Sequence, residues 1–377
     1  MKFSRFLFLL ALFGPITFSI TEADAQRQSP FDLWDKNSDG KLVREELPAP
    51  LRRNFDRVDR DGDGFISRGE DAAFRSQNRP APRPSGGGKA LEGIKTIADQ
   101  DYAGIGNPRQ TLDLFLPEKP ATDDPLPVVV FIHGGGWQNG DKGGGGRKLM
   151  PLLATGKYAG ASIGYRLSDE AQWPSQIHDC KAAIRWIRAH AEEYHLDPKR
   201  IAVWGTSAGG HLVAMLGTSH GVEDLEGDIG PNTGQDSSVQ AVADFFGPTE
   251  MLTMGKGDGF ASHDSPESPE SKLLGGPVQE VPDVARSASP IEHVSKDDAP
   301  FLIVHGDQDP VVPYAQSVDF EKKLESAGVP AVFITVEGGG HGKGFGPSTT
   351  AAVEAFLAKE LLGEERELKD GSVKAGE

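Results

Sequence analysis

The chain has 377 residues, of which 37% are hydrophobic, enough for one large domain with a buried core and a smaller domain. Its 56 acidic residues outnumber the 39 basic ones, which gives a formal net charge of -17. Nucleic acids and anionic membranes select basic surfaces, so this balance argues against both as partners. Cys180 is the single cysteine, which excludes an intrachain disulfide.

The N-terminal segment has the pattern of a secretory signal peptide. Basic residues precede an apolar run at positions 6–13, and a small-x-small cleavage site ends at Ala25. The sequence therefore predicts a signal peptide over residues 1–25 and an exported protein, periplasmic or extracellular. An uncleaved anchor is the alternative, but Gly14 and Pro15 interrupt a run that is short for the ~20 residues of a membrane span. No later segment is apolar enough to cross a membrane.

Two acidic stretches within residues 27–78 fit the twelve-residue calcium loop, with oxygen ligands at positions 1, 3, 5, 7 and 12 and glycine at position 6. The first offers Asp35, Asn37, Asp39, the carbonyl of Lys41 and Glu46, and the second offers Asp59, Asp61, Asp63, the carbonyl of Phe65 and Glu70. Leu42 and Ile66 take position 8, where paired hands make a short strand contact. A solvated acidic turn is the alternative for one loop, but two successive matches resemble an EF-hand pair. We expect weak extracellular calcium binding, at about 10⁻⁴–10⁻³ M.

Residues 79–90 are rich in proline and glycine and are interpreted as a linker. Over residues 91–362, apolar runs alternate with helical patterns, which predicts an α/β domain with a mostly parallel sheet flanked by helices. The runs expected to be strands are Val128–His133, Ile201–Gly205, Phe301–Gly306 and Ala331–Gly338, the last one nearer the sheet edge.

Two helices and a tail complete this domain. Ile177, Cys180, Ile184 and Ile187 fall on one helical stripe, so Cys180 is expected to be a core thiol. A second helix is expected over residues 314–327, with Gly328 placed to end it. The tail of residues 363–377 is highly charged, and we expect it to fray.

Gly205–Gly209, "GTSAG", follows a predicted strand and precedes a predicted helix, the context of a nucleophile elbow. A serine hydroxyl is a weak nucleophile, so it requires a base, a group that orients the base, and donors for the oxyanion. The N–H of Ala208 is expected to be one such donor. Taken alone, the pattern fits a plain glycine-rich turn equally well, so the assignment of Ser207 depends on the other parts.

Those parts occur in a workable order. His133–Trp137, "HGGGW", ends the first strand, and the unobstructed N–H groups of Gly135 and Gly136 are the expected oxyanion donors. A flexible loop is the alternative, and it is the interpretation for the glycines at 143–146, which lack phosphate-loop spacing.

The acid and the base are predicted from the loops after the third and fourth strands. "HGDQDPVVP" (His305–Pro313) offers Asp307 and Asp309, and "GGGHGKGF" (Gly338–Phe345) offers His341. The order serine, aspartate, histidine is the one that the α/β-hydrolase fold requires. His133, His211 and His305 are expected to be structural.

The motifs resemble the α/β-hydrolase serine esterases, in the branch that joins feruloyl-esterase-like and acetylxylan-esterase-like proteins to the hormone-sensitive-lipase type. The resemblance covers about residues 92–362, through "HGGGW", "GYRL", "WPSQIHDCKAAIRWIR", "GTSAGGHL", "SPESKLLGG", "SPIEHVS", "HGDQDPVVP" and "GGGHG". It implies Ser207 as nucleophile, Asp309 rather than Asp307 as acid, and His341 as base. Thr206 before the serine and the HGGG loop favour an esterase over a peptidase.

The sequence therefore predicts an exported serine hydrolase that cleaves carboxylic esters, plausibly acetyl or feruloyl esters of polysaccharides, and that requires no cofactor for its chemistry. The substrate class comes from the resemblance alone. The alternatives are a general short-chain esterase or lipase, a peptidase, and a catalytically inactive calcium-dependent binding module.

Overall fold

The computed structural model describes residues 40–47, 52, 55–59, 62–67, 70 and 91–377. The chain divides into two compact units, residues 1–82 and residues 83–377. The predicted signal peptide and linker lie outside the described residues. None of the helices in the described part of the chain combines the length and apolar composition that a bilayer crossing requires.

The described part of the small unit is a short ribbon with one helical turn. Strands β1 (Lys41–Leu42) and β2 (Ile66–Ser67) pair antiparallel, with Leu42 opposite Ile66. Helix α2 covers Phe55–Val58. The buried apolar side chains in the described part of the small unit form one cluster: Leu42, Leu47, Phe55, Val58 and Ile66. The predicted strand contact between Leu42 and Ile66, at position 8 of the two acidic loops, is therefore confirmed.

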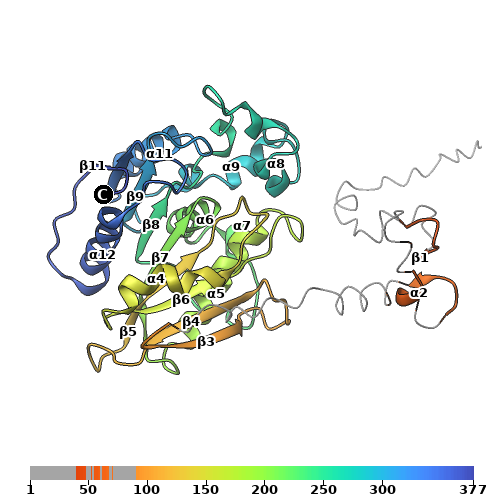
Figure 1. The fold of residues 1–377 in the computed structure, drawn as a ribbon, viewed down its shortest axis with the longest axis horizontal. Helices are drawn as coiled ribbons and strands as arrows, with labels where there is room; N and C mark the ends of the chain where they lie inside the picture. The colour runs from red at the N-terminus through yellow and green to blue at the C-terminus, as the bar shows by residue number, and fades with distance from the viewer. Residues whose placement is uncertain (1–39, 48–51, 53–54, 60–61, 68–69, 71–90) are drawn as a thin grey trace, which may run out of the picture. The chain divides into compact units, whose positions relative to one another are not determined.

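A nine-stranded sheet forms the centre of the large unit (Figure 1), in the order β11-β10-β9-β8-β7-β5-β6-β4-β3. Only β4 runs opposite to the other strands, because it pairs antiparallel with both of its neighbours. The prediction of a mostly parallel sheet is therefore confirmed. The strands are β3 (Ile94–Asp101), β4 (Thr111–Pro117), β5 (Leu126–Ile132), β6 (Ala159–Ile163), β7 (Leu196–Thr206), β8 (Ala241–Phe245), β9 (Phe301–Gly306), β10 (Ala331–Glu337) and β11 (Gly371–Lys374).

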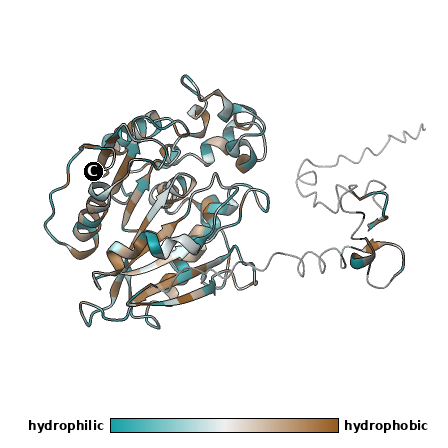
Figure 2. Cartoon of the chain, viewed as in Figure 1, coloured by the Kyte–Doolittle hydropathy of each residue, from teal (hydrophilic) through white to brown (hydrophobic). Residues whose placement is uncertain are grey.

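Helices cover both faces of this sheet, which explains the continuous apolar runs. Helices α5 (Ser175–Ala189), α6 (Ala208–Thr218) and α11 (Ala315–Ala327) share one buried cluster with the sheet. Helices α4 (Gly145–Leu153) and α12 (Pro347–Leu362) share the other. Figure 2 shows hydrophobic and hydrophilic residues together on α12, as expected of a helix with one covered face.

Strand β5 shows how one apolar run serves two cores. Alternate side chains of a strand point to opposite faces. Accordingly, Val128, Val130 and Ile132 belong to the cluster of α5 and α6, whereas Val129 and Phe131 belong to the cluster of α4 and α12. All seven residues of β5 are buried.

Most of the shorter helices belong to the chain segment that connects β8 to β9, and this segment lies beyond the carboxyl ends of the strands (Figure 1). They are η3 (Lys142–Gly144), α7 (Glu223–Glu226), η4 (Met251–Thr253), η5 (Ala261–Asp264), α8 (Pro269–Leu274), η6 (Val278–Glu280), α9 (Pro282–Ser287) and α10 (Pro290–His293). The segment that contains η5 and α8 supplies one wall of a polar pocket.

Both predicted helices are confirmed, with small differences at their ends. Cys180 is fully buried in α5, as expected of a core thiol. Gly328 follows α11 with a φ of 80°, a left-handed conformation that glycine adopts without a Cβ clash.

Two predictions for the large unit are wrong. The glycines at 143–146 do not form a flexible loop, because Gly145 and Gly146 begin helix α4. A Cβ on Gly145 would lie 2.1 Å from the Ser162 hydroxyl oxygen, so close helix–sheet packing explains the glycine. The tail does not fray throughout, because residues 371–374 add strand β11 to the open edge of β10.

Candidate active site

Ser207 occupies a sharp turn between β7 and α6. Its backbone has φ 56° and ψ -123°, which non-glycine residues rarely adopt, and its N–H donates to the carbonyl of Phe245 at 2.9 Å. A Cβ on Gly205 would lie 2.1 Å from the Gly209 carbonyl oxygen, and one on Gly209 would lie 2.1 Å from the Ile132 oxygen. The glycines on either side of the serine are therefore required because backbone segments pass each other closely.

Three side chains from separate loops form one hydrogen-bonded chain. The Oγ of Ser207 lies 2.9 Å from Nε2 of His341, and Nδ1 of His341 lies 2.7 Å from Oδ2 of Asp309. A carboxylate only accepts, so Nδ1 of His341 carries the proton and Nε2 is free to accept from the serine hydroxyl. The structure thus brings together the three residues that the sequence order singled out.

Asp309 is buried and held as a carboxylate. Burial alone would raise its pKa, but hydrogen bonds from His305, His341 and the N–H groups of Val311 and Val312 outweigh it and hold the pKa well below its ordinary value. Because its pKa is lowered, the carboxyl group is ionised near neutral pH and can orient His341 as an acceptor.

Asp307, the alternative acid, points elsewhere. Its Oδ1 accepts a hydrogen bond of 2.7 Å from the N–H of Gly338, at the start of the loop that carries His341. Asp307 therefore fixes the backbone of the histidine loop, and Asp309 contacts the imidazole itself.

The glycines after β5 pass directly beside Ser207. A Cβ on Gly134 would lie 2.6 Å from the Thr206 carbonyl oxygen and 3.2 Å from Cβ of Ser207, so only glycine fits. Gly135 and Gly136 have φ of 118° and 59°. Among the described residues, no loop carbonyl accepts from the N–H of Gly135, Gly136 or Ala208. These three groups are available to a negative oxygen beside the serine.

Two neutral histidines hold this glycine loop in place. Burial lowers the pKa of both His133 and His211 to about 4. Nδ1 of His133 donates to the Gly134 carbonyl at 2.8 Å, and its ring stacks on Tyr165. Nδ1 of His211 accepts from the indole N–H of Trp137 at 3.1 Å. The structural role expected for these histidines is confirmed.

His305 and His263 support the acid loop. Nδ1 of His305 is 2.7 Å from the Ser317 hydroxyl, and Nε2 is 3.4 Å from Oδ2 of Asp309. The ring nitrogens of His263 lie 2.9 Å from Oε1 of Glu270 and 2.9 Å from the Val311 carbonyl oxygen. The hydrogen bond to Glu270 raises the pKa of His263, and when the imidazole is protonated both nitrogens donate to these two oxygens. The sequence interpretation missed His263, because it lies in no recognised motif.

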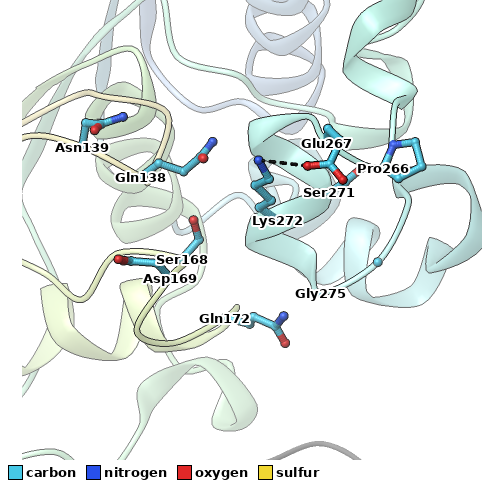
Figure 3. A pocket seen from close by; sticks show the side chains of 11 residues that line it. Gln138, Asn139, Ser168, Asp169, Gln172, Pro266, Glu267, Ser271, Lys272 and Gly275 are labelled. Atoms are coloured by element: carbon cyan, nitrogen blue, oxygen red, sulfur yellow. Dashed lines mark ion pairs between the residues drawn. The ribbon is translucent and has the colours of Figure 1, made fainter. Parts of the chain in front are cut away.

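A polar pocket of about 550 Å³ continues from the glycine loop. Figure 3 shows side chains from three segments around it, with Lys272 paired to Glu267 at 3.3 Å. Gly136 of the glycine loop lies close to this pocket wall, because a Cβ on Gly136 would lie 3.4 Å from Pro269, the first residue of α8. The lining carries amides, hydroxyls and charged groups and no aromatic side chain: Gln138, Asn139, Ser168, Asp169, Gln172, Pro266, Glu267, Ser271, Lys272, Gly275 and Gly276.

Strand β8 contributes Asp244, and the position just after β8 contributes Phe246; the sequence interpretation missed both residues. Phe246 has φ 46° and packs edge-on against His341, with ring centroids 4.7 Å apart. Asp244, opposite Gly205 in the sheet, is fully buried, and burial raises its pKa to about 7. Its Oδ1 accepts from the N–H of Gly247 at 3.0 Å. Neither residue lies in a pattern that distinguishes it from an ordinary strand residue.

The predicted calcium ligands are described only in part. Asp35, Asn37, Asp39 and Asp61 lie outside the described residues. Lys41 is the first residue of β1, and Phe65 immediately precedes β2. Each loop's glutamate folds back on its own backbone, because Oε2 of Glu46 accepts from Val43 N–H at 3.0 Å and Oε2 of Glu70 from Ser67 N–H at 2.9 Å.

The second loop adds contacts within itself. The carboxylate of Asp59 accepts from the N–H groups of Gly62 and Gly64, at 2.8 and 3.0 Å. Oδ1 of Asp63 accepts from the N–H of Phe65 at 2.9 Å. The Asp59 carboxylate therefore ties the described residues 62–64 to the start of the loop.

Comparison with known proteins places the large unit in a family. The model of the BD-FAE family matches residues 112–324, more than half of the chain, and the chain therefore belongs to that family. Esterase LipC of Mycobacterium tuberculosis is 32% identical over 63% of this chain and 57% of its own length. The probable carboxylic ester hydrolase LipM of the same organism is 30% identical over 81% of this chain and 74% of its own length.

A solved structure agrees with these relatives. A truncated carbohydrate esterase from gut microbiota is 36% identical, with a TM-score of 0.59, over 66% of this chain and 89% of that one. The chain spans little more than half the length of LipC. The fold is that of the α/β-hydrolases, and the relatives that the large unit resembles are named as esterases and a carboxylic ester hydrolase.

Proposed function

We propose that the protein hydrolyses carboxylic esters with Ser207 as nucleophile, His341 as base and Asp309 as the acid that orients the base. The observation that carries this proposal is the continuous hydrogen-bonded chain, 2.9 Å from serine to histidine and 2.7 Å from histidine to aspartate. The esterase relatives support the same reaction class.

The geometry suggests the order of events. Nε2 of His341 accepts the proton as Oγ of Ser207 bonds to the ester carbon, and the N–H groups of Gly135, Gly136 and Ala208 stabilise the oxyanion. The imidazolium then protonates the departing alcohol, which leaves an acyl group on Ser207. Water, deprotonated by His341, releases the acid and restores the enzyme. These residues supply each proton transfer, so we expect no cofactor to be required.

The substrate we favour is an acyl ester of a carbohydrate, such as an acetyl or feruloyl ester of a polysaccharide. The pocket beside the glycine loop supports this choice, because its amide, hydroxyl and charged groups suit the many hydroxyls of a sugar better than an alkyl chain. The carbohydrate esterase of similar fold points the same way. A general short-chain esterase or lipase is the second candidate, and a peptidase or an inactive binding module is less well supported.

The test is a panel of acetyl, butyryl, feruloyl and long-chain esters, on simple alcohols and on a saccharide, assayed with wild type and Ser207→Ala. We expect acetylated or feruloylated saccharide to give the highest kcat/KM, and Ser207→Ala to lose at least ~10³-fold on every ester. Preference for long-chain esters on simple alcohols would favour the lipase alternative. Equal turnover by the variant would refute the serine mechanism.

We propose further that the small unit is a calcium-binding EF-hand pair. Two observations support it: Gly40 and Gly64, the sixth residues of the two loops, have φ of 79° and 84°, as the sharp turn of such a loop requires. The β1–β2 pairing then joins the two loops as it does in a pair. The ligands would be Asp35, Asn37, Asp39, the Lys41 carbonyl and Glu46, and the matching five residues of the second loop.

Calcium should stabilise the small unit and change turnover little, because none of its ligands belongs to the proposed triad or oxyanion hole. Bound ion stabilises only the unit that binds it, by RT ln(1 + [L]/Kd). Calorimetry with and without chelator should show one calcium-sensitive and one calcium-insensitive transition, with unchanged p-nitrophenyl acetate hydrolysis. A large loss of turnover on chelation would contradict this independence.

We also propose export through the segment of residues 1–25. The charged-apolar-small pattern of that segment supports it. N-terminal sequencing of the protein recovered from periplasm and medium of an expressing bacterium should begin near Gln26. Retention of Met1 on a cytoplasmic product would contradict the proposal.

A further inference from the structure

The loop that carries His341 closes on itself in a short turn, in which the N–H of Gly340 donates to the Lys343 carbonyl at 3.0 Å and the N–H of Lys343 donates to the Gly340 carbonyl at 3.3 Å. Six of the nine residues at positions 338–346 are glycine, and ordering glycine costs more conformational entropy than ordering any other residue. Yet Nε2 of His341 must stay within hydrogen-bond distance of Ser207 for proton transfer. The turn sets the local backbone at His341, but contacts from outside the loop are needed to hold that turn against Ser207.

The first half of this loop is fixed by the acid loop. The N–H of Gly338 donates to Oδ1 of Asp307 at 2.7 Å, and the N–H of Gln308 donates to the Gly339 carbonyl at 2.9 Å. These bonds precede His341 in the chain. They leave the residues that follow the histidine to be held in another way.

The second half is held by residues 375–377, far along the chain. The N–H of Gly376 donates to the Gly344 carbonyl at 2.7 Å, and the N–H of Ser348 donates to the Glu377 carbonyl at 3.1 Å. The N–H of Ala375 donates to the Glu337 carbonyl at 3.0 Å. The segment thus contacts the loop itself at Gly344 and the residues that flank the loop at Glu337 and Ser348.

Strand β11 anchors this segment to the sheet. It pairs parallel with β10 from Ile334 opposite Gly371 to Glu337 opposite Lys374. Just before it, Oδ1 of Asp370 accepts from the N–H of Phe333 at 2.9 Å. The Ser372 hydroxyl also bonds to the Glu337 carboxylate. Figure 1 shows β11 at the edge of the large unit, where it extends the sheet beyond β10.

We propose that residues 370–377 are a clamp that positions His341 for catalysis. This inference rests on the proposed role of His341 as base. The clamp touches neither Ser207 nor the imidazole, so its effect is on position: it fixes the backbone after the histidine, as Asp307 fixes the backbone before it. Phe345 adds a second contact there, since its ring packs 5.0 Å from that of Phe246. Loss of the clamp should lower kcat and leave KM nearly unchanged.

A compensating pair of substitutions tests the clamp. A Cβ on Gly344 would lie 2.7 Å from Cβ of Ala375, so Gly344→Ala should push the clamp away, and Ala375→Gly should relieve the clash. Gly338→Ala is the matched control, because Gly338 has a similar φ of 73° in the same loop but nothing within 4 Å of the added Cβ. It measures the cost of the backbone strain alone.

We expect Gly344→Ala to lower kcat by about 10-fold or more, because small misplacements of a catalytic group are costly. Gly338→Ala should lower it much less, and Gly344→Ala with Ala375→Gly should recover most of the loss. Deletion of residues 371–377, checked for folding by circular dichroism, should also lower kcat at an unchanged KM.

Full kcat in Gly344→Ala or in the folded deletion variant would overturn the clamp, as would a double variant no better than the single one. Wild type and Ser207→Ala are assayed alongside. If Ser207→Ala keeps its activity, the proposed function fails; if it loses activity and the clamp variants keep theirs, only the clamp fails.

Discussion

The serine turn and the histidine loop are both rich in glycine, but Gly205 and Gly209 of the turn serve a different need from Gly338 of the loop. Around Ser207, Gly205 and Gly209 allow backbone segments to touch, because a Cβ on either would lie 2.1 Å from a carbonyl oxygen. In the histidine loop, Gly338 has open space where a Cβ would point. Gly338 is favoured there because its φ is positive, a conformation that glycine adopts freely, and not because a side chain would lack space.

The difference shows how each reactive group is held. Ser207 lies directly between its own strand and helix, and its N–H adds one bond to the Phe245 carbonyl of the neighbouring strand. His341 is fixed by residues from distant loops and by the strand at positions 371–374. We therefore expect the position of Ser207 to tolerate substitutions far from it in the chain and to be disturbed by substitutions beside it. The position of His341 should tolerate substitutions beside it better than substitutions in the distant segments that hold it.

The two aspartates of the acid loop give the largest expected contrast. Asp309→Asn should lower kcat by about 10³-fold or more, because an amide no longer stabilises the tautomer that His341 requires. Asp307→Asn should cost about 10-fold or less, since the amide oxygen can still accept from Gly338. Steady-state kinetics on p-nitrophenyl acetate decides this. A larger loss for Asp307→Asn would mean that the acid is assigned to the wrong residue.

Two glycine substitutions compare the regions directly. Gly205→Ala forces a Cβ against the Gly209 carbonyl and should cost about 3 kcal/mol of stability or more. Gly338→Ala adds only backbone strain, about 1–2 kcal/mol. Thermal unfolding of both variants, with wild type as reference, measures the difference. Equal losses of stability in the two variants would show that Gly205 and Gly338 do not differ as proposed.

His263 offers a smaller, pH-dependent effect on the acid loop. Its pKa is raised, chiefly by the hydrogen bond to Glu270, so its stabilisation is fully present below the ordinary value of 6.5 and is lost as pH rises through the folded-state pKa. The Tm of wild type should exceed that of His263→Gln by about 1–3 °C at pH 6, and by less at pH 9. A gap that widens with pH would contradict the imidazolium bridge.

Much of the site could be predicted from the sequence because each of its residues directly follows a strand that the sequence itself predicts. Parallel strands end at the same edge, so residues just after β5, β7, β9 and β10 converge, and their order along the chain suffices to pair Ser207, Asp309 and His341. The glycine spacing around the serine has a direct geometric cause, and it was read correctly as a turn between strand and helix.

The remainder depends on tertiary contacts that carry no periodic signal. Strand β11 is four residues long in a highly charged tail, and it becomes a strand because β10 offers an open edge. Asp244 resembles any strand aspartate until its burial is known. The polar pocket is assembled from three separate segments between residues 138 and 276, so its shape could not be inferred.

The covalent step at Ser207 tests the central claim most directly. Wild type and Ser207→Ala are treated with a p-nitrophenyl alkylphosphonate, and the adduct is located by peptide mass spectrometry alongside residual esterase activity. We predict one phosphonylated peptide, containing Ser207, in wild type, with loss of activity in proportion to labelling and no adduct in the variant. Full inhibition with the adduct on another residue, or ester turnover by Ser207→Ala at the wild-type rate, would contradict the account.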